Sequence, residues 1–78
     1  MDKKSVKEAL AERRQRLINE HKDLLGMEIT QARAVLGYWW VLSDQFVVPD
    51  GVSTYTFRRA GTGVLRLHVE NNIVKKIS

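Results

Sequence analysis

Apolar residues in the first third of the chain recur at intervals of three, four or seven positions. This spacing places one set of residues on one side of an α-helix: Val6, Leu10, Leu17, His21, Leu24 and Leu25. The pattern predicts a helix over residues 5–25, ended by Gly26, because glycine readily adopts the left-handed conformation that closes a helix. Arg13 interrupts the apolar stripe, so residues 1–12 are expected to form a projecting or frayed start of this helix.

A second, short helix is predicted over residues 28–36. Its apolar residues share a face at helical spacing, namely Ile29, Ala32, Val35 and Leu36. Gly37 is expected to end this helix as Gly26 ends the first. A short junction containing glycine separates the two helices, so we expect them to pack as an angled pair.

In the second half of the chain the apolar period changes to two, which is typical of β-strands. Residues 54–58 and 64–70 alternate in this way, with an inward set of Tyr55, Phe57, Leu65, Leu67 and Val69. The glycine-rich residues 60–63 predict a hairpin loop between them. The Asn-Asn pair at residues 71–72 predicts a tight turn into a further strand over residues 73–77.

An additional edge strand is predicted at either residues 39–42 or residues 45–48. Because the helices come first and the strands follow, the order α-α-β-β-β predicts an α+β fold. Residues 1–78 are expected to form one domain, in which two N-terminal helices pack on one face of a three- or four-stranded antiparallel β-meander. A chain of 78 residues is long enough for a single hydrophobic core and no more.

Composition narrows the class of protein. The chain has no cysteine, which excludes disulfides, thiolate zinc sites and cysteine nucleophiles. No stretch approaches the about 20 apolar residues of a membrane span. The polar N-terminus shows no secretory leader and no lipid-attachment cysteine. We therefore expect a protein without a membrane span or anchor, located in the cytoplasm, or in the periplasm if a leader has been removed.

The charge balance permits an anionic partner without requiring one. Thirteen Lys and Arg against nine Asp and Glu give a net charge of +4. Residues 1–37 carry eight basic and six acidic residues, and residues 38–78 carry five and three, so each half is +2. No basic tail stands apart, whereas nucleic-acid-binding proteins more often show a concentrated basic patch.

One motif resembles that of a known family. Gly26-Met27, eight intervening residues and Leu36-Gly37 are similar to the G-M-(x8)-L-G signature of the SmpA/OmlA (BamE-like) domain. The resemblance extends over residues 26–78, where residues 55–58 and 65–74 resemble the family's strands. It implies a BamE-like α+β domain and a non-enzymatic interaction module, similar in fold to domains that bind and sometimes inhibit other proteins. The chain lacks the family's lipoprotein signal and lipid-anchor cysteine.

The residue types needed for catalysis do not occur at productive spacing. His21 and His68 show no H-x-x-x-H or H-E-x-x-H spacing, and Ser43-Asp44 lies in no G-x-S-x-G turn. The G-T-G of residues 61–63 lacks the further residues of a phosphate-binding loop, so we interpret it as a hairpin loop. His21 is interpreted as a helix residue at the border of the core. The sequence therefore predicts no catalytic site, no metal site and no cofactor.

An aromatic cluster is the strongest candidate for a binding surface. Tyr38, Trp39 and Trp40 are adjacent, and three neighbours on a strand cannot all face inward. Tyrosine and tryptophan are enriched at binding hot spots. Together with Phe46 they predict a protein-binding surface, used by an inhibitor or an assembly factor of a larger complex, of the kind that phages and mobile elements encode. Burial of both tryptophans and pairing of two copies as a homodimer remain open alternatives.

A basic strip is the second candidate. If the inward set faces the helices, the opposite side of the sheet presents a group of basic residues, Arg58, Arg66, His68 and Lys76, joined at the loop by Arg59. These residues are the expected contacts of an anionic partner, and they make a small nucleic-acid-binding protein the alternative function. The first helix, with Arg13, Arg14 and Arg16 among its basic residues, is a second surface for the same purpose. The simpler interpretation of the strip is the solvated face that antiparallel sheets normally have.

Overall fold

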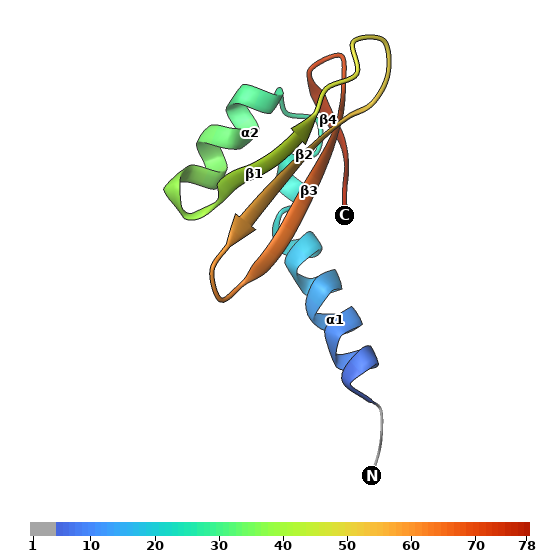
Figure 1. Ribbon diagram of the computed structural model, residues 1–78, viewed down its shortest axis with the longest axis vertical. Coiled ribbons are helices and arrows are strands. Elements are labelled where there is room, and N and C mark those ends of the chain that lie inside the picture. Colours follow the sequence, from blue (N-terminus) through green and yellow to red (C-terminus); the bar gives the residue numbers. More distant parts are fainter. Residues whose placement is uncertain (1–4) are drawn as a thin grey trace.

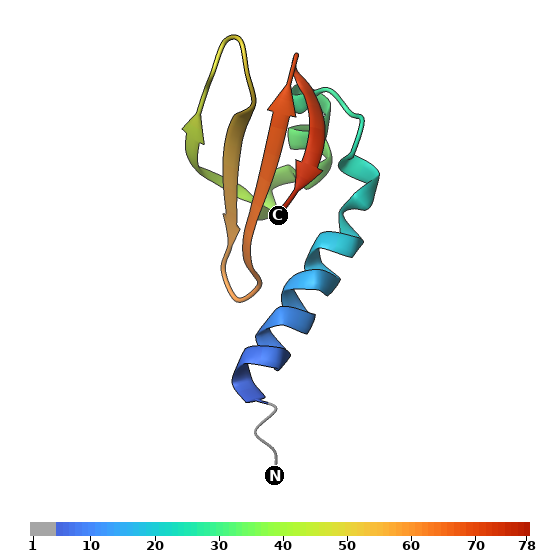
Figure 2. The same cartoon turned by 90° about the vertical axis from the view of Figure 1, so that its right-hand side faces the viewer.

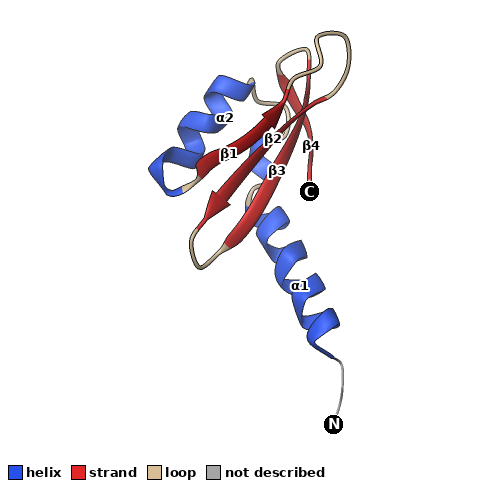
Figure 3. Ribbon diagram, viewed as in Figure 1, coloured by secondary structure: helices blue, strands red, loops and turns tan. Residues whose placement is uncertain are grey.

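The computed structural model describes residues 5–78 and has an α+β fold (Figure 1). Its elements are helix α1 (Ser5–Glu20), the 3-10 turn η1 (Lys22–Leu24), helix α2 (Ile29–Leu36), the 3-10 turn η2 (Gly37–Trp39) and strands β1 (Val41–Phe46), β2 (Ser53–Arg59), β3 (Gly63–Glu70) and β4 (Ile73–Ile77). The helices precede the strands, so the predicted class is confirmed (Figure 3). The first four residues of the predicted projecting start, residues 1–4, lie outside the described part of the chain.

The strands form one antiparallel sheet in the order β1-β2-β3-β4. β2, β3 and β4 match the predicted strands, and the connection from β3 to β4 is the predicted Asn-Asn turn, with φ of 54° at Asn71 and 67° at Asn72. β1 overlaps both of the segments considered for an edge strand. Its register shifts between Leu42 and Asp44, which places a bulge at Ser43.

The core lies between α2 and one face of the sheet, called here the inner face. It contains the predicted inward residues Phe57, Leu65, Leu67 and Val69, with Tyr55 partly buried against them. β4 adds Val74 and Ile77, and α2 adds Ile29, Ala32 and Leu36. Val35 was predicted to share the buried face of α2 but is 58% exposed. It precedes Leu36, and consecutive residues lie about 100° apart around a helix, so the narrow contact with the sheet does not reach it.

The first helix is shorter than predicted. α1 ends at Glu20, and residues 22–24 continue as the 3-10 turn η1. Gly26 has the expected positive φ, 88°, but it does not end the helix. Its N–H donates to the carbonyl of Val74 at 2.9 Å, so its conformation instead brings the chain alongside β4.

In the described part of the chain, α1 contacts the rest of the fold through its C-terminal half. Leu17 is buried and Ile18 packs against the core, whereas Val6 and Leu10 are 75% and 56% exposed. Figures 1 and 2 show the helix running beyond the sheet instead of across it. The predicted packing of both helices on one face is therefore shown in part: α2 packs on the inner face, and α1 contacts the core through Leu17 and Ile18. Arg13 interrupts the apolar stripe between Leu10 and Leu17, so α1 has no continuous apolar face on the N-terminal side of Leu17.

The two edges of the sheet differ. The β4 edge is bonded to residues 26–29, through Val74 N–H to the carbonyl of Met27 and Ile29 N–H to the carbonyl of Asn72, both at 2.8 Å. In the described chain no comparable segment pairs with the free side of β1, which pairs with β2 alone. β1 therefore lies at the open edge, next to the aromatic cluster.

Candidate functional site

A single turn separates the three aromatic residues into different environments. α2 ends at Gly37, whose φ and ψ are 69° and −158°, a region in which glycine is strongly favoured. The N–H of Gly37 donates to the carbonyl of Arg33. The turn η2 then carries Tyr38 and Trp39 outward, where they are 98% and 70% exposed. The chain becomes extended at Trp40, whose side chain is directed inward.

Trp40 belongs to the core. Its side chain is 6% exposed and meets His21 edge-to-face, with ring centroids 5.5 Å apart and planes at 88°. His21 is half-buried, as predicted for a residue at the border of the core, but it follows the end of α1 instead of lying in the helix. Its Nδ1 lies 2.9 Å from the carbonyl oxygen of Leu17. The placement of Trp40 on the binding surface is corrected, because an extended residue after an outward-facing turn points to the opposite side.

Phe46 is exposed but lies away from the other aromatic residues. It is the last residue of β1, opposite Thr54, and is 68% exposed. β1 runs from Val41 to Phe46, a span of about 16 Å at about 3.3 Å per residue, so Phe46 lies at the end of the strand away from the turn that carries Trp39. The structure therefore does not bring the predicted set together. Two of its members are adjacent, one is buried, and Phe46 is at the other end of the open edge.

Arg59 joins the exposed aromatic pair. Its guanidinium carbon lies 5.4 Å from the centroid of the Trp39 ring, a cation–π arrangement. Arg58 points to the other face of β2, where its Nε donates to Ser43 Oγ at 3.2 Å. The two adjacent arginines are thus held on opposite sides of the strand. We call Tyr38, Trp39 and Arg59 together the aromatic–arginine surface.

A cleft between α2 and β1 adjoins Tyr38. It has a volume of about 630 Å³, and Trp40, Leu42 and Phe57 contribute to its lining from the core side. Arg33 lines the α2 side. This volume is within the about 300–1,000 Å³ that is typical of ligand sites, so the cleft can accept a side chain of a partner.

Four residues of the predicted basic strip lie on the outer face of the sheet, namely Arg58, Arg66, His68 and Lys76, whereas Arg59 lies on the other side of β2. Thr54, His68 and Lys76 lie opposite one another across β2, β3 and β4. Burial lowers the pKa of His68, and the nearby charges of Lys76 and Arg66 lower it further. His68 Nε2 lies 2.7 Å from Ser78 Oγ. His68 is therefore neutral at neutral pH, and the positive charge of this face comes from arginine and lysine alone.

Phe46 extends this row. It lies opposite Thr54 on the outer face, so an exposed aromatic ring stands at the end of the row that contains His68 and Lys76. The outward aromatic residue that the basic strip lacked in the sequence is supplied by β1. The bulge at Ser43 decides the orientation of Phe46, because it reverses the alternation within the strand.

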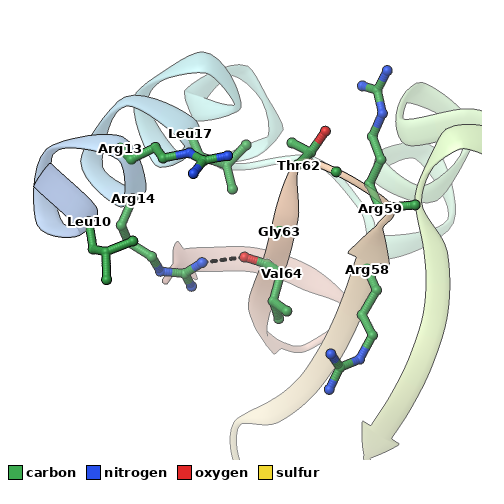
Figure 4. Close-up of a pocket in the computed structure, with 11 residues that line it drawn as sticks. Leu10, Arg13, Arg14, Leu17, Arg58, Arg59, Thr62, Gly63 and Val64 are labelled. Carbon is green, nitrogen blue, oxygen red and sulfur yellow. Dashed lines mark hydrogen bonds between the residues drawn. The ribbon is translucent and has the colours of Figure 1, made fainter. Parts of the chain in front are cut away.

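The structure also forms a basic groove that the sequence did not predict. It lies between α1 and the β2–β3 turn, and we call it the arginine groove (Figure 4). It is lined by Arg13 and Arg14 on the helix side, by Arg58 and Arg59 on the strand side and by Leu10 and Leu17. Its volume is about 590 Å³. The pairs Arg13-Arg14 and Arg58-Arg59 were visible in the sequence, but no pattern indicated that they line the same groove.

Two contacts hold the helix at this groove. Arg14 donates a hydrogen bond from its guanidinium to the carbonyl of Val64, at the start of β3. Leu17 lies over Gly63, where a Cβ would stand 3.8 Å from Leu17 Cδ2. Since Arg58 pairs with Val41 and Val64, the groove and the aromatic–arginine surface lie at the same end of the sheet, and Arg59 belongs to both.

Metal and membrane sites were searched in residues 5–78. This part of the chain has no group of three or more His, Cys, Asp or Glu side chains that could hold a metal ion. None of its helices combines the length and apolar character needed to cross a bilayer.

Comparisons of the chain with known protein families, with curated proteins and with solved structures found no match. The similarity of residues 26–78 to the SmpA/OmlA domain stays a prediction from its motif.

Proposed function

We propose that this protein is a non-catalytic protein-binding domain and that the aromatic–arginine surface is its contact surface. The observation that carries the proposal is the exposure of Tyr38 and Trp39, 98% and 70%, on a turn fixed from both sides. Gly37 sets the direction of the turn, and Trp40 anchors its far end in the core. Exposed aromatic rings next to an arginine are the residue types in which binding hot spots are enriched.

The side chain of Trp39 is already held in place in the free protein, which reduces the entropy lost on binding. A side chain that is immobilised only on binding loses about 0.5–1.5 kcal/mol. Trp39 is already in contact with Arg59, so its ring loses less freedom when a partner covers it. The cleft beside Tyr38 provides a recess in which a partner side chain would be buried.

The proposed role is that of an inhibitor or an assembly factor of a larger complex, in the cytoplasm. The similarity to BamE-like domains supports an interaction module of this kind. A second copy of the chain is the competing occupant of the same surface, because Val35 and Val41, which lie close to it in the sequence, are also exposed apolar residues. The oligomeric state of the free protein separates these two partners.

A second candidate function is nucleic-acid binding on the outer face of the sheet. The specific observation in its favour is the exposed ring of Phe46 in the row that ends at Lys76. Arg66 lies beside this row and is exposed. Aromatic stacking next to phosphate contacts is the arrangement used by proteins that bind single strands.

Affinity capture tests the first proposal against the second. The immobilised protein is incubated with nuclease-treated extract of its native host, and the retained proteins are identified by mass spectrometry. We expect a specific protein to be retained by the wild type and by Phe46→Ala but lost with Trp39→Ala. Trp39 and Phe46 have nearly equal exposure, so the two variants remove comparable aromatic surface. Retention that requires nucleic acid, or equal loss in both variants, contradicts the proposal.

A further inference from the structure

Positive charge is concentrated in the arginine groove. Four arginines line it, and no acidic residue of the described chain does so. The whole chain carries thirteen basic and nine acidic residues, so outside these four arginines the charges cancel. Each half of the sequence, with a net charge of +2, contributes two of these four arginines.

Part of this charge is unpaired. Arg14 and Arg58 are engaged by Val64 and Ser43. Within residues 5–78, Arg13 has no hydrogen-bond or ion-pair partner, and neither has Arg16, which lines a smaller pocket beside the groove together with Glu20. A guanidinium presents a planar fork of donors that matches a carboxylate or a phosphate in a bidentate contact. The groove thus has free donors for an anion.

The apolar lining decides between the two kinds of anionic partner. Leu10 and Leu17 lie between the arginines, and Leu10 is 56% exposed. A peptide can cover Leu10 with an aliphatic side chain while its carboxylates reach the arginines. The sugars and phosphates of a nucleic acid would leave this apolar surface in contact with polar groups. Of the described residues that line the groove, none is aromatic, and bases bind single-strand sites by stacking on such rings.

We infer that the arginine groove binds an acidic peptide segment of the partner protein, with carboxylates on Arg13 and Arg16 and an aliphatic side chain over Leu10. The inference rests on the proposed function, because it assigns a second contact to the same partner. Arg59 lies in both surfaces, so a single partner can occupy them side by side. Glu20 lies in the pocket beside the groove and would repel a carboxylate placed there. The acidic part of the bound peptide should therefore not extend as far as Glu20.

The test uses a fluorescein-labelled peptide rich in glutamate and leucine, measured by fluorescence anisotropy with the full chain. We expect Arg13→Glu combined with Arg16→Glu to weaken binding by at least about tenfold. The matched control is Arg66→Glu combined with Lys76→Glu, which makes the same change in net charge on the outer sheet face and leaves the affinity within about twofold. Glu20→Gln should strengthen binding, an effect that loss of structure cannot produce.

Replacing the glutamates of the probe by glutamine should abolish binding, and replacing its leucines by serine should weaken it. Thermal unfolding of each variant shows that the fold is retained. No binding of the acidic peptide, equal weakening by both charge-reversal pairs, or tighter binding of a labelled single-stranded DNA in the groove overturns the inference.

The failure of this inference is distinguishable from the failure of the proposed function. If the captured partner depends on Trp39 but is unaffected by charge reversal at Arg13 and Arg16, the groove inference fails and the protein-binding function stands. If the groove binds the acidic peptide but no protein depends on Trp39, the aromatic–arginine surface fails instead.

Discussion

The guanidinium of Arg59 lies over the indole ring of Trp39, with 5.4 Å between the arginine Cζ and the ring centroid. The contact joins the end of β2 to the turn after α2. A cation–π pair at an exposed site is worth about 0.5–1 kcal/mol, which is too little to determine the fold. This energy is enough to favour one orientation of the exposed Trp39 ring. Arg59 also lines the arginine groove, so it is shared by the two candidate surfaces.

The two neighbouring tryptophans are expected to respond differently to truncation. Trp40→Ala removes a core ring and its contact with His21, and such changes cost about 3–5 kcal/mol. A single core in a chain of about 80 residues rarely supplies more than about 3–5 kcal/mol, so this variant should be largely unfolded near room temperature. Trp39→Ala should change the free energy of unfolding by less than about 1 kcal/mol. Urea denaturation followed by circular dichroism measures both, and equal destabilisation contradicts the assignment of core and surface.

Gly37→Ala should destabilise the fold through the backbone alone. No atom lies within 4 Å of the position that a Cβ would take, so no clash contributes. The φ and ψ of 69° and −158° are nevertheless unfavourable for any residue with a Cβ, at about 1–3 kcal/mol. We expect the free energy of unfolding to decrease by this amount, which lowers the denaturation midpoint. The emission of Trp39 should also change, because its position depends on the turn. An unchanged midpoint would show that the turn is not held in this conformation.

Leu17→Ala should release α1 without unfolding the sheet. Leu17 is the buried residue of the helix, lying over Gly63, and short helices are marginal without such packing. Native-state hydrogen exchange should show reduced protection in residues 6–20 and unchanged protection in β2 and β3. Leu10→Ala, at an exposed position of the same stripe, is the matched control and should leave the exchange of both regions close to wild type. A uniform loss of protection in Leu17→Ala would indicate that the helix and sheet unfold together.

His68 makes stability depend on pH in a predictable direction. Burial, followed by the charges of Lys76 and Arg66, lowers its pKa in the folded protein below the usual 6.5. The unfolded chain therefore binds more protons as the pH falls through this value. The contribution of the neutral ring to stability is complete above pH 6.5 and is lost as the pH falls through the folded pKa.

Denaturation of the wild type and of His68→Gln at about pH 7.5 and about pH 5 checks this sign. The free energy of unfolding of the wild type should decrease more on acidification than that of the variant. Groups that titrate elsewhere are common to both proteins and cancel in the comparison. A larger decrease in His68→Gln would mean that folding favours the protonated ring.

The strands could be predicted because the sequence pattern that determines them lies within each strand and its adjoining turn. Alternation from Val64 to Glu70 and the Asn-Asn turn determine which side chains face α2 without reference to distant parts of the chain. The end of α1 could not be predicted in this way. Leu24 and Leu25 continue the helical spacing, but the contact of His21 with Trp40 and the bond of Gly26 to Val74 favour a turn there.

The candidate site was predictable only in its residue types. Three adjacent aromatic residues indicated that at least one is exposed, but the 3-10 turn η2 decides that Tyr38 and Trp39 are outside and Trp40 inside. The arginine groove depends on a contact between Arg14 and Val64, which are 50 positions apart. Charge counted along the sequence contains no information about such a contact, so the even distribution of charge between the two halves did not indicate that four arginines line one groove.

Photo-crosslinking from the aromatic–arginine surface tests the central claim most directly. Tyr38, which is 98% exposed, is replaced by benzoylphenylalanine, and the same replacement at Phe46 serves as the control on the outer face. After irradiation in the native host, we expect a discrete protein adduct from position 38 that survives nuclease treatment, and none from position 46. Adducts with nucleic acid, equal protein adducts from both positions, or no adduct from position 38 would contradict the claim.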